Sequence, residues 1–145
     1  MVPDLTGKMT PRIGLEGKFS VYHSVAVAIV EGAAGEPQYS DRAVKDPTVV
    51  ALRDKVKAVI DPAIKPEQID MTITLRDGRT LHKYIAHAIG SLEVPMSDEQ
   101  LGGKFLGLVK GILPDAQAHA LMERCWNVAT LNSAAEIAQQ AVRRS

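Results

Sequence analysis

IDMTITLRDGRTLHKYIAHA, residues 69–88, decides the fold class of this chain. Every second residue from Ile69 to Leu75 is apolar and the residues between them are polar, which is the period of a β-strand. Asp77-Gly78 follows as a turn, and then a second β-rich run begins. Two such runs around an Asp-Gly predict a β-hairpin, with strands at residues 69–76 and 80–88.

A third strand is predicted just before the hairpin. Residues 55–60 alternate between polar and apolar side chains, with Val56, Ala58 and Ile60 on one side. We therefore expect a small antiparallel sheet of about three or four strands.

Helices are predicted before and after these strands in the sequence, from local capping signals, and are expected to lie on one side of the sheet. Ser20 and Gly32 bracket an apolar run, Asp46-Pro47 begins a second helix, and Ser97-Asp98-Glu99-Gln100 forms a capping box. Two more helices are expected after Pro114 and after Ser133. This order of elements indicates an α+β fold, in which the small sheet packs with helices and is followed by C-terminal helices.

The composition argues against several classes of protein. The chain has 145 residues, of which 46% are hydrophobic and 23% charged, as expected for a folded domain. Its 17 basic and 17 acidic residues balance, and both kinds mix around the predicted hairpin, so we expect no nucleic-acid partner. One cysteine, no membrane-length apolar run and no signal-peptide core predict a cytoplasmic protein without a membrane partner.

GLEGKFSVYHSVAVAIVEG, residues 14–32, carries the candidate chemistry. It is not a phosphate loop, because only two residues separate its glycines and Phe19 lies between Lys18 and Ser20. Ser20 is predicted to cap the helix and His23 to occupy its first turn, where the helix dipole disfavours an imidazolium. A neutral histidine beside free backbone N–H groups suits an anion or a carbonyl, and Lys18 adds a positive charge. The alternative, in which Ser20 only caps and His23 only packs, stays open.

No metal site is expected from the sequence. The histidines lie at positions 23, 82, 87 and 119, and none forms an i, i+4 pair on a helix or joins cysteines in a zinc pattern. A Gly-x-Ser-x-Gly nucleophile elbow is also missing from the sequence.

Four stretches in this order resemble the C-terminal part of the MmgE/PrpD family. They are GLEGKFSVYHSVAVAIVEG at 14–32, DPTVVALRDKV at 46–56, LRDGRT at 75–80 and VPMSDEQLGGKF at 94–105. The resemblance runs from about Pro3 to the end of the chain. Members of the family include 2-methylcitrate dehydratase, cis-aconitate decarboxylase and iminodisuccinate epimerase. The resemblance implies an α+β lid that closes over a small polycarboxylate substrate, without a metal or an organic cofactor.

The resemblance also implies a large all-helical N-terminal domain that carries most of the catalytic residues and that these 145 residues do not include. Residues 1–145 would then form a single C-terminal lid domain. The helices of residues 114–145 would return to pack on the helical domain.

A candidate site follows from the same resemblance. His23 matches the position of a substrate-facing tyrosine in some members, which makes it the candidate catalytic residue. Lys18, Ser20 and Tyr22 are the candidate substrate-binding residues around it.

Two functions remain for this chain. The first is a part of a cofactor-independent lyase or isomerase, similar to 2-methylcitrate dehydratase, which we expect to be inactive without its helical domain because proton transfer needs a positioned acid and base. The alternative is a non-enzymatic binding or assembly module that pairs with a separate helical partner, and formation of a homodimer or larger homo-oligomer stays open. The terminal helices are expected to leave an apolar patch formed by Leu121, Trp126, Val128, Ile137 and Val142.

Overall fold

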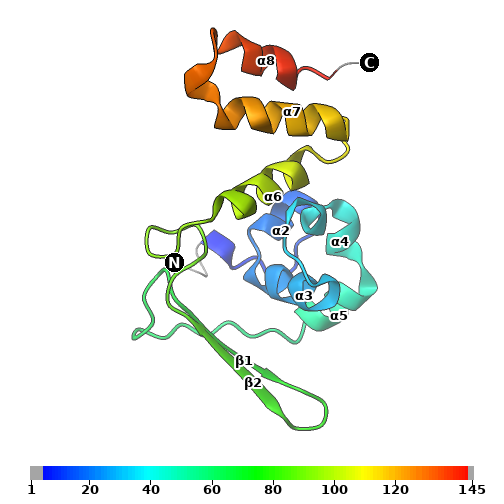
Figure 1. Ribbon diagram of the computed structural model, residues 1–145. Coiled ribbons are helices and arrows are strands. Elements are labelled where there is room, and N and C mark those ends of the chain that lie inside the picture. The colour runs from blue at the N-terminus through cyan, green and yellow to red at the C-terminus, as the bar shows by residue number, and fades with distance from the viewer. Residues whose placement is uncertain (1–4, 144–145) are drawn as a thin grey trace. The chain divides into compact units, whose positions relative to one another are not determined.

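The computed structural model describes residues 5–143, in which irregular segments join several helices and one β-hairpin (Figure 1). They divide into two units, Met1–Val94 and Pro95–Ser145. The first unit contains short helices and the hairpin, and the second contains helices. The α+β class predicted from the sequence is confirmed.

The helices of the first unit follow one another closely along the chain. They are α2 (Gly14–Lys18), α3 (Val21–Glu31), the 3-10 helix η1 (Glu36–Tyr39), α4 (Asp41–Lys45) and α5 (Pro47–Arg53). The predicted caps of α3 and α5 are confirmed. Ser20 accepts a hydrogen bond from the backbone N–H of His23, Gly32 ends α3 with a φ of 69°, and Asp46 accepts from the first N–H groups of α5.

The core of the first unit lies between α3 and α5. Ala26, Val27 and Val49 have 0% of their surface exposed, and Leu52 packs against them. Ala26 and Val27 of the apolar run of α3 therefore enter the core. Ile29 and Val30 of the same run are 47% and 39% exposed, although a helix without a polar face is expected to be buried.

The hairpin consists of strands β1 (Ile69–Thr74) and β2 (Thr80–Ile85), which pair in antiparallel register. Gly78 has a φ of 86° and supplies the turn. Both strands are shorter than predicted, and residues 86–88 lie outside β2. The side chains of both strands are exposed or half-buried, so the hairpin adds none of the buried residues of the core.

The third strand predicted at residues 55–60 is wrong. Residues 56–60 are irregular, and the sheet of the described residues has two strands rather than three or four. Val59 and Ile60 are 86% and 73% exposed. Polar and apolar side chains alternate only as far as residue 58, because residues 58–60 are all apolar. A strand also needs a neighbouring strand to satisfy its backbone groups, and none lies beside this segment in the described chain.

Two short helices, α2 and η1, lie in segments where the sequence analysis predicts no helix. Helix α2 begins at Gly14, whose backbone N–H donates to the Asp41 carboxylate at 2.7 Å. A Cβ atom on Gly14 would lie 1.9 Å from the carbonyl oxygen of Tyr39, so this glycine allows α2 to approach the end of η1. Contacts distant in the sequence thus stabilise helices that are too short to form alone.

The second unit contains α6 (Asp98–Val109), α7 (Asp115–Trp126), the 3-10 helix η2 (Val128–Thr130) and α8 (Ala135–Ala141), and Figure 1 shows α7 beside α8. The predicted capping box is confirmed, because Ser97 accepts from the N–H of Gln100 and its own N–H donates to the Gln100 side chain. Gln117 of α7 donates to two carbonyl oxygens, those of Gln140 and Val142, each at 2.6 Å. This amide ties the end of α8 to α7.

The apolar residues expected to form a patch on the terminal helices differ in exposure. Leu121 is only 6% exposed, so its expected place on the surface is wrong; it forms the core of the second unit with Leu113 and Ala118. Ile137 is half-buried against this core. The three that are exposed are Trp126, Val128 and Val142.

Candidate functional site

The first turn of α3 has a closed network of hydrogen bonds. The Ser20 hydroxyl accepts from the N–H of His23 at 3.0 Å, and the Ser20 side chain is almost fully buried. The carbonyl of Ser20 accepts from the hydroxyl of Ser24 at 2.9 Å. That hydroxyl in turn accepts from the phenol of Tyr39 at 2.9 Å. Ser20 is thus a helix cap, as predicted, and its oxygen atoms are engaged within the protein.

His23 lies beneath η1 with 0% of its surface exposed. Its Nε2 is 2.8 Å from the carbonyl oxygen of Gln38, and since a carbonyl oxygen only accepts, Nε2 is the donor. In a neutral ring the lone pair is then on Nδ1, a buried atom with no hydrogen-bond partner among the described residues. The edge of the ring meets Tyr39 at a centroid distance of 5.6 Å, and a Cβ on Gly17 would lie 3.2 Å from its Cδ2.

Lys18 is directed to η1. Its Nζ bonds both carboxylate oxygens of Glu36, at 2.9 and 2.8 Å, and both side chains are partly exposed. Tyr22, in the same first turn as His23, is half-buried. The structure therefore brings Ser20 and His23 together and pairs Lys18 with Glu36.

The segment η1 covers the start of α3 through three contacts. They are the Lys18–Glu36 ion pair, the bond from His23 to Gln38 and the bond from Tyr39 to Ser24. The sequence prediction missed these η1 residues because it placed no helix at residues 36–39. Pro37, the second residue of η1, was the available signal, since proline is tolerated in the first turn of a helix.

A carboxylate also lies shortly before α3 in the sequence. Glu16 of α2 accepts from the Lys8 ammonium and from the backbone N–H of Arg12, each at 2.7 Å. These bonds, the Lys8 bond first, lower the pKa of Glu16 to about 2 from an ordinary value of 4.5. Glu16 is thus paired with basic residues that precede α2.

The comparison with protein families gives one decisive match. The model of the MmgE/PrpD C-terminal domain matches residues 2–128. The chain belongs to the MmgE/PrpD family. The comparison with curated proteins finds no match.

The other histidines of this MmgE/PrpD domain have separate surroundings. His82 bonds the Asp70 carboxylate across the hairpin, and Nδ1 of His119 donates to a carbonyl oxygen of its own helix. His87 lies 3.7 Å from Glu93, whose pKa is lowered by its own backbone N–H, by a serine hydroxyl and by His87. Residues 5–143 contain no group of three or more side chains arranged to hold a metal ion.

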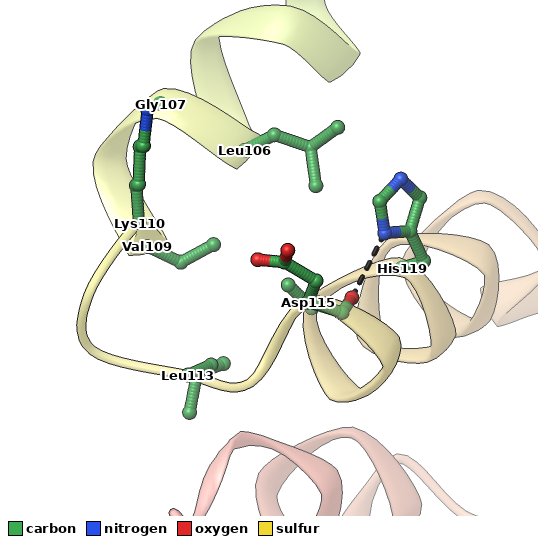
Figure 2. A pocket seen from close by; sticks show the side chains of 8 residues that line it. Leu106, Gly107, Val109, Lys110, Leu113, Asp115 and His119 are labelled. Atoms are coloured by element: carbon green, nitrogen blue, oxygen red, sulfur yellow. Dashed lines mark hydrogen bonds between the residues drawn. The ribbon is translucent and has the colours of Figure 1, made fainter.

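The second unit of the MmgE/PrpD domain has a pocket of about 280 Å³ between α6 and α7. Leu106, Val109 and Leu113 form apolar walls, and the Asp115 carboxylate points into the space between them (Figure 2). His119 lies at the edge of the pocket, held by its bond to the Asp115 carbonyl. The described helices, here and in the first unit, are too short or too polar to cross a membrane.

Proposed function

We propose that this chain is the C-terminal part of a cofactor-independent, cytoplasmic lyase or isomerase, similar to 2-methylcitrate dehydratase, that acts on a small polycarboxylate. The observation that carries the proposal is the family match over residues 2–128. The reaction would remove a proton α to a carboxylate and then eliminate water or carbon dioxide, or return the proton to the other face.

Such a reaction needs an acid and a base on either side of one substrate. The four histidines of this chain instead have four different partners, namely Gln38, Asp70, Glu93 and Asp115. We therefore propose that a helical domain, in the same polypeptide or in a separate one, supplies most of the acid and base groups. This chain would supply the lid and would be inactive without that domain.

The first turn of α3 is the proposed substrate-facing part of the lid. Its amino end presents the positive pole of the helix dipole, which favours a carboxylate. His23 would accept a proton or a hydrogen bond at Nδ1, the nitrogen that lacks a partner. Lys18, Ser20 and Tyr22 would bind the substrate around it.

Contact between His23 and a substrate requires a movement of η1. The ring is 0% exposed and is covered by the segment that holds Gln38 and Tyr39. We propose that docking of the helical domain or of the substrate displaces η1, which breaks the exposed ion pair of Lys18 with Glu36 and frees the lysine for a substrate carboxylate. Because that pair is exposed, its loss costs little free energy.

Steady-state kinetics of the assembled enzyme test this role. His23→Ala should lower kcat by about 100-fold or more, the usual contribution of a general acid or base. His82→Ala is the matched control, since His82 is an exposed histidine on the hairpin. Equal kcat values for the two variants would exclude His23 from catalysis. If the folded His23→Ala enzyme still binds substrate, its lower kcat reflects a lost catalytic group and not a disrupted structure.

The second candidate function is a non-enzymatic assembly module that binds a helical partner. The exposed apolar side chains of Trp126, Val128 and Val142 favour it. Under this alternative the complex with the helical partner binds but does not convert polycarboxylates. A chain that stays monomeric at high concentration and binds no hydrophobic dye would contradict it.

A further inference from the structure

Arg53, the last residue of α5, carries a buried positive charge. It is only 6% exposed, and it shares a face of the helix with Val49, which lies in the core. A guanidinium keeps its charge in proteins, and a buried charge is costly unless an opposite charge or several hydrogen bonds compensate it. Among residues 5–143, Arg53 has no carboxylate partner and one hydrogen bond, from Nη1 to the carbonyl of Val44 at 3.3 Å. The described protein therefore compensates this charge only in part.

The edge of the guanidinium that suits a carboxylate is the one without a partner. Nε is buried and has no hydrogen-bond partner among the described residues. The N–H groups of Nε and Nη2 point in the same direction, and two such parallel groups bind the two oxygens of a carboxylate. Because Nη1 alone contacts Val44, a carboxylate on this edge leaves the bond to Val44 intact.

Arg53 is connected by packing to the proposed substrate-facing turn of α3. Val44, whose carbonyl accepts from Arg53, also contacts the segment before α3. A Cβ atom on Gly17 would lie 2.8 Å from Cγ2 of Val44 and 3.2 Å from Cδ2 of His23, so both side chains lie against this glycine. Contacts thus run from Arg53 through Val44 and Gly17 to His23. A polycarboxylate has at least two carboxylates, and the first turn of α3 is proposed to bind one of them.

A purely structural role does not account for a charged residue at position 53. An apolar side chain of similar volume in place of a buried charge is often neutral or stabilising, and methionine adapts well to such sites. A lysine would also supply the charge, but only an arginine presents a planar pair of N–H groups. Residues that cost stability are expected where function requires them.

We propose that Arg53 binds a carboxylate of a small di- or tricarboxylate through Nε and Nη2. This site rests on the proposed function, since it takes the substrate carboxylate that does not face His23. Arg53 would then determine specificity, because a monocarboxylate could not occupy both the first turn of α3 and this site. The occupant is a small molecule and not an acidic side chain of the helical domain.

Calorimetric titration of the 145-residue chain with succinate, at constant ionic strength, tests the site. Arg53→Met should raise the dissociation constant of succinate by at least about tenfold, because it removes two charge-assisted hydrogen bonds. Arg42→Met is the matched control, since Arg42 is an exposed arginine of the same unit, and it should bind succinate like the wild type. Arg53→Lys keeps the charge but should also bind more weakly. Urea denaturation should show that Arg53→Met is at least as stable as the wild type.

Three results would overturn the proposal. They are no binding of succinate by the wild-type chain, equal dissociation constants for the wild type and Arg53→Met, and an Arg53→Met variant that binds the helical domain more weakly but succinate equally well. The last result would show that an acidic side chain of the partner is the occupant.

Kinetics of the assembled enzyme separate this proposal from the proposed function. An unchanged kcat/KM of Arg53→Met for a polycarboxylate would refute the role of Arg53 and leave the proposed function intact. Binding of succinate through Arg53 by an assembled protein that converts no polycarboxylate would refute the proposed function and leave the site intact.

Discussion

Replacement of His23 by alanine should destabilise the first unit by about 3 kcal/mol. The imidazole ring is fully buried, and truncation of a buried side chain of this size costs about 2 kcal/mol or more, because the surroundings collapse only in part. The substitution also removes the donor to the Gln38 carbonyl, which adds about 1 kcal/mol. A domain of ordinary stability would still fold after this loss.

His23→Gln is the matched variant, because a glutamine side chain retains an N–H donor. It should lose less than His23→Ala in the free energy of unfolding, measured by urea denaturation. Hydrogen exchange should localise the effect, since faster exchange is expected in residues 36–39, which His23 holds against α3. A loss below about 0.5 kcal/mol for His23→Ala, the size expected for a surface change, would refute this account of His23. Unchanged exchange in η1 would refute it equally.

Three further predictions concern stability. The pKa of Glu16 is lowered to about 2 from 4.5, so its carboxylate contributes stability that is fully present above pH 4.5 and is lost as the pH falls toward 2. The melting temperature of the wild type should therefore fall more steeply over that range than that of Glu16→Gln. Gly14→Ala should lower the free energy of unfolding by about 2 kcal/mol, because its Cβ would lie 1.9 Å from a carbonyl oxygen. Gly103→Ala, in open space within α6, should instead raise it by up to about 1 kcal/mol. Urea denaturation measures both. Gln117→Ala should lower the free energy of unfolding of the second unit by about 2 kcal/mol in urea denaturation, since it removes the donor to two carbonyl oxygens. The fluorescence of Trp126, the single tryptophan, reports on that unit.

The elements that local signals define could be predicted from the sequence. Each helix cap satisfies N–H groups only a few residues away, so it can be predicted without knowledge of the tertiary structure. This holds for Ser20, for Asp46 and for the Ser97–Gln100 pair. The same is true of the hairpin, where alternation and an Asp-Gly turn lie within one segment. Family membership was also predictable, because four stretches occur in the expected order.

Elements that depend on distant contacts could not be predicted in this way. Strand periodicity at residues 55–60 gave no information on whether a neighbouring strand exists. Helix α2 depends on Asp41, 27 residues away from Gly14, which no local pattern reveals. The surroundings of His23 were also hidden, because the groups that cover it lie in a segment without strong periodicity.

Turnover by the separated and the combined parts tests the central proposal most directly. The 145-residue chain, the family's helical domain and their mixture would each be assayed with 2-methylcitrate, cis-aconitate and iminodisuccinate, and the products followed by nuclear magnetic resonance. We predict that this chain alone converts none of them, and that the mixture converts at least one faster than the helical domain alone. Turnover by this chain alone, or a mixture no more active than the helical domain, would contradict its proposed role as the lid of a polycarboxylate lyase or isomerase.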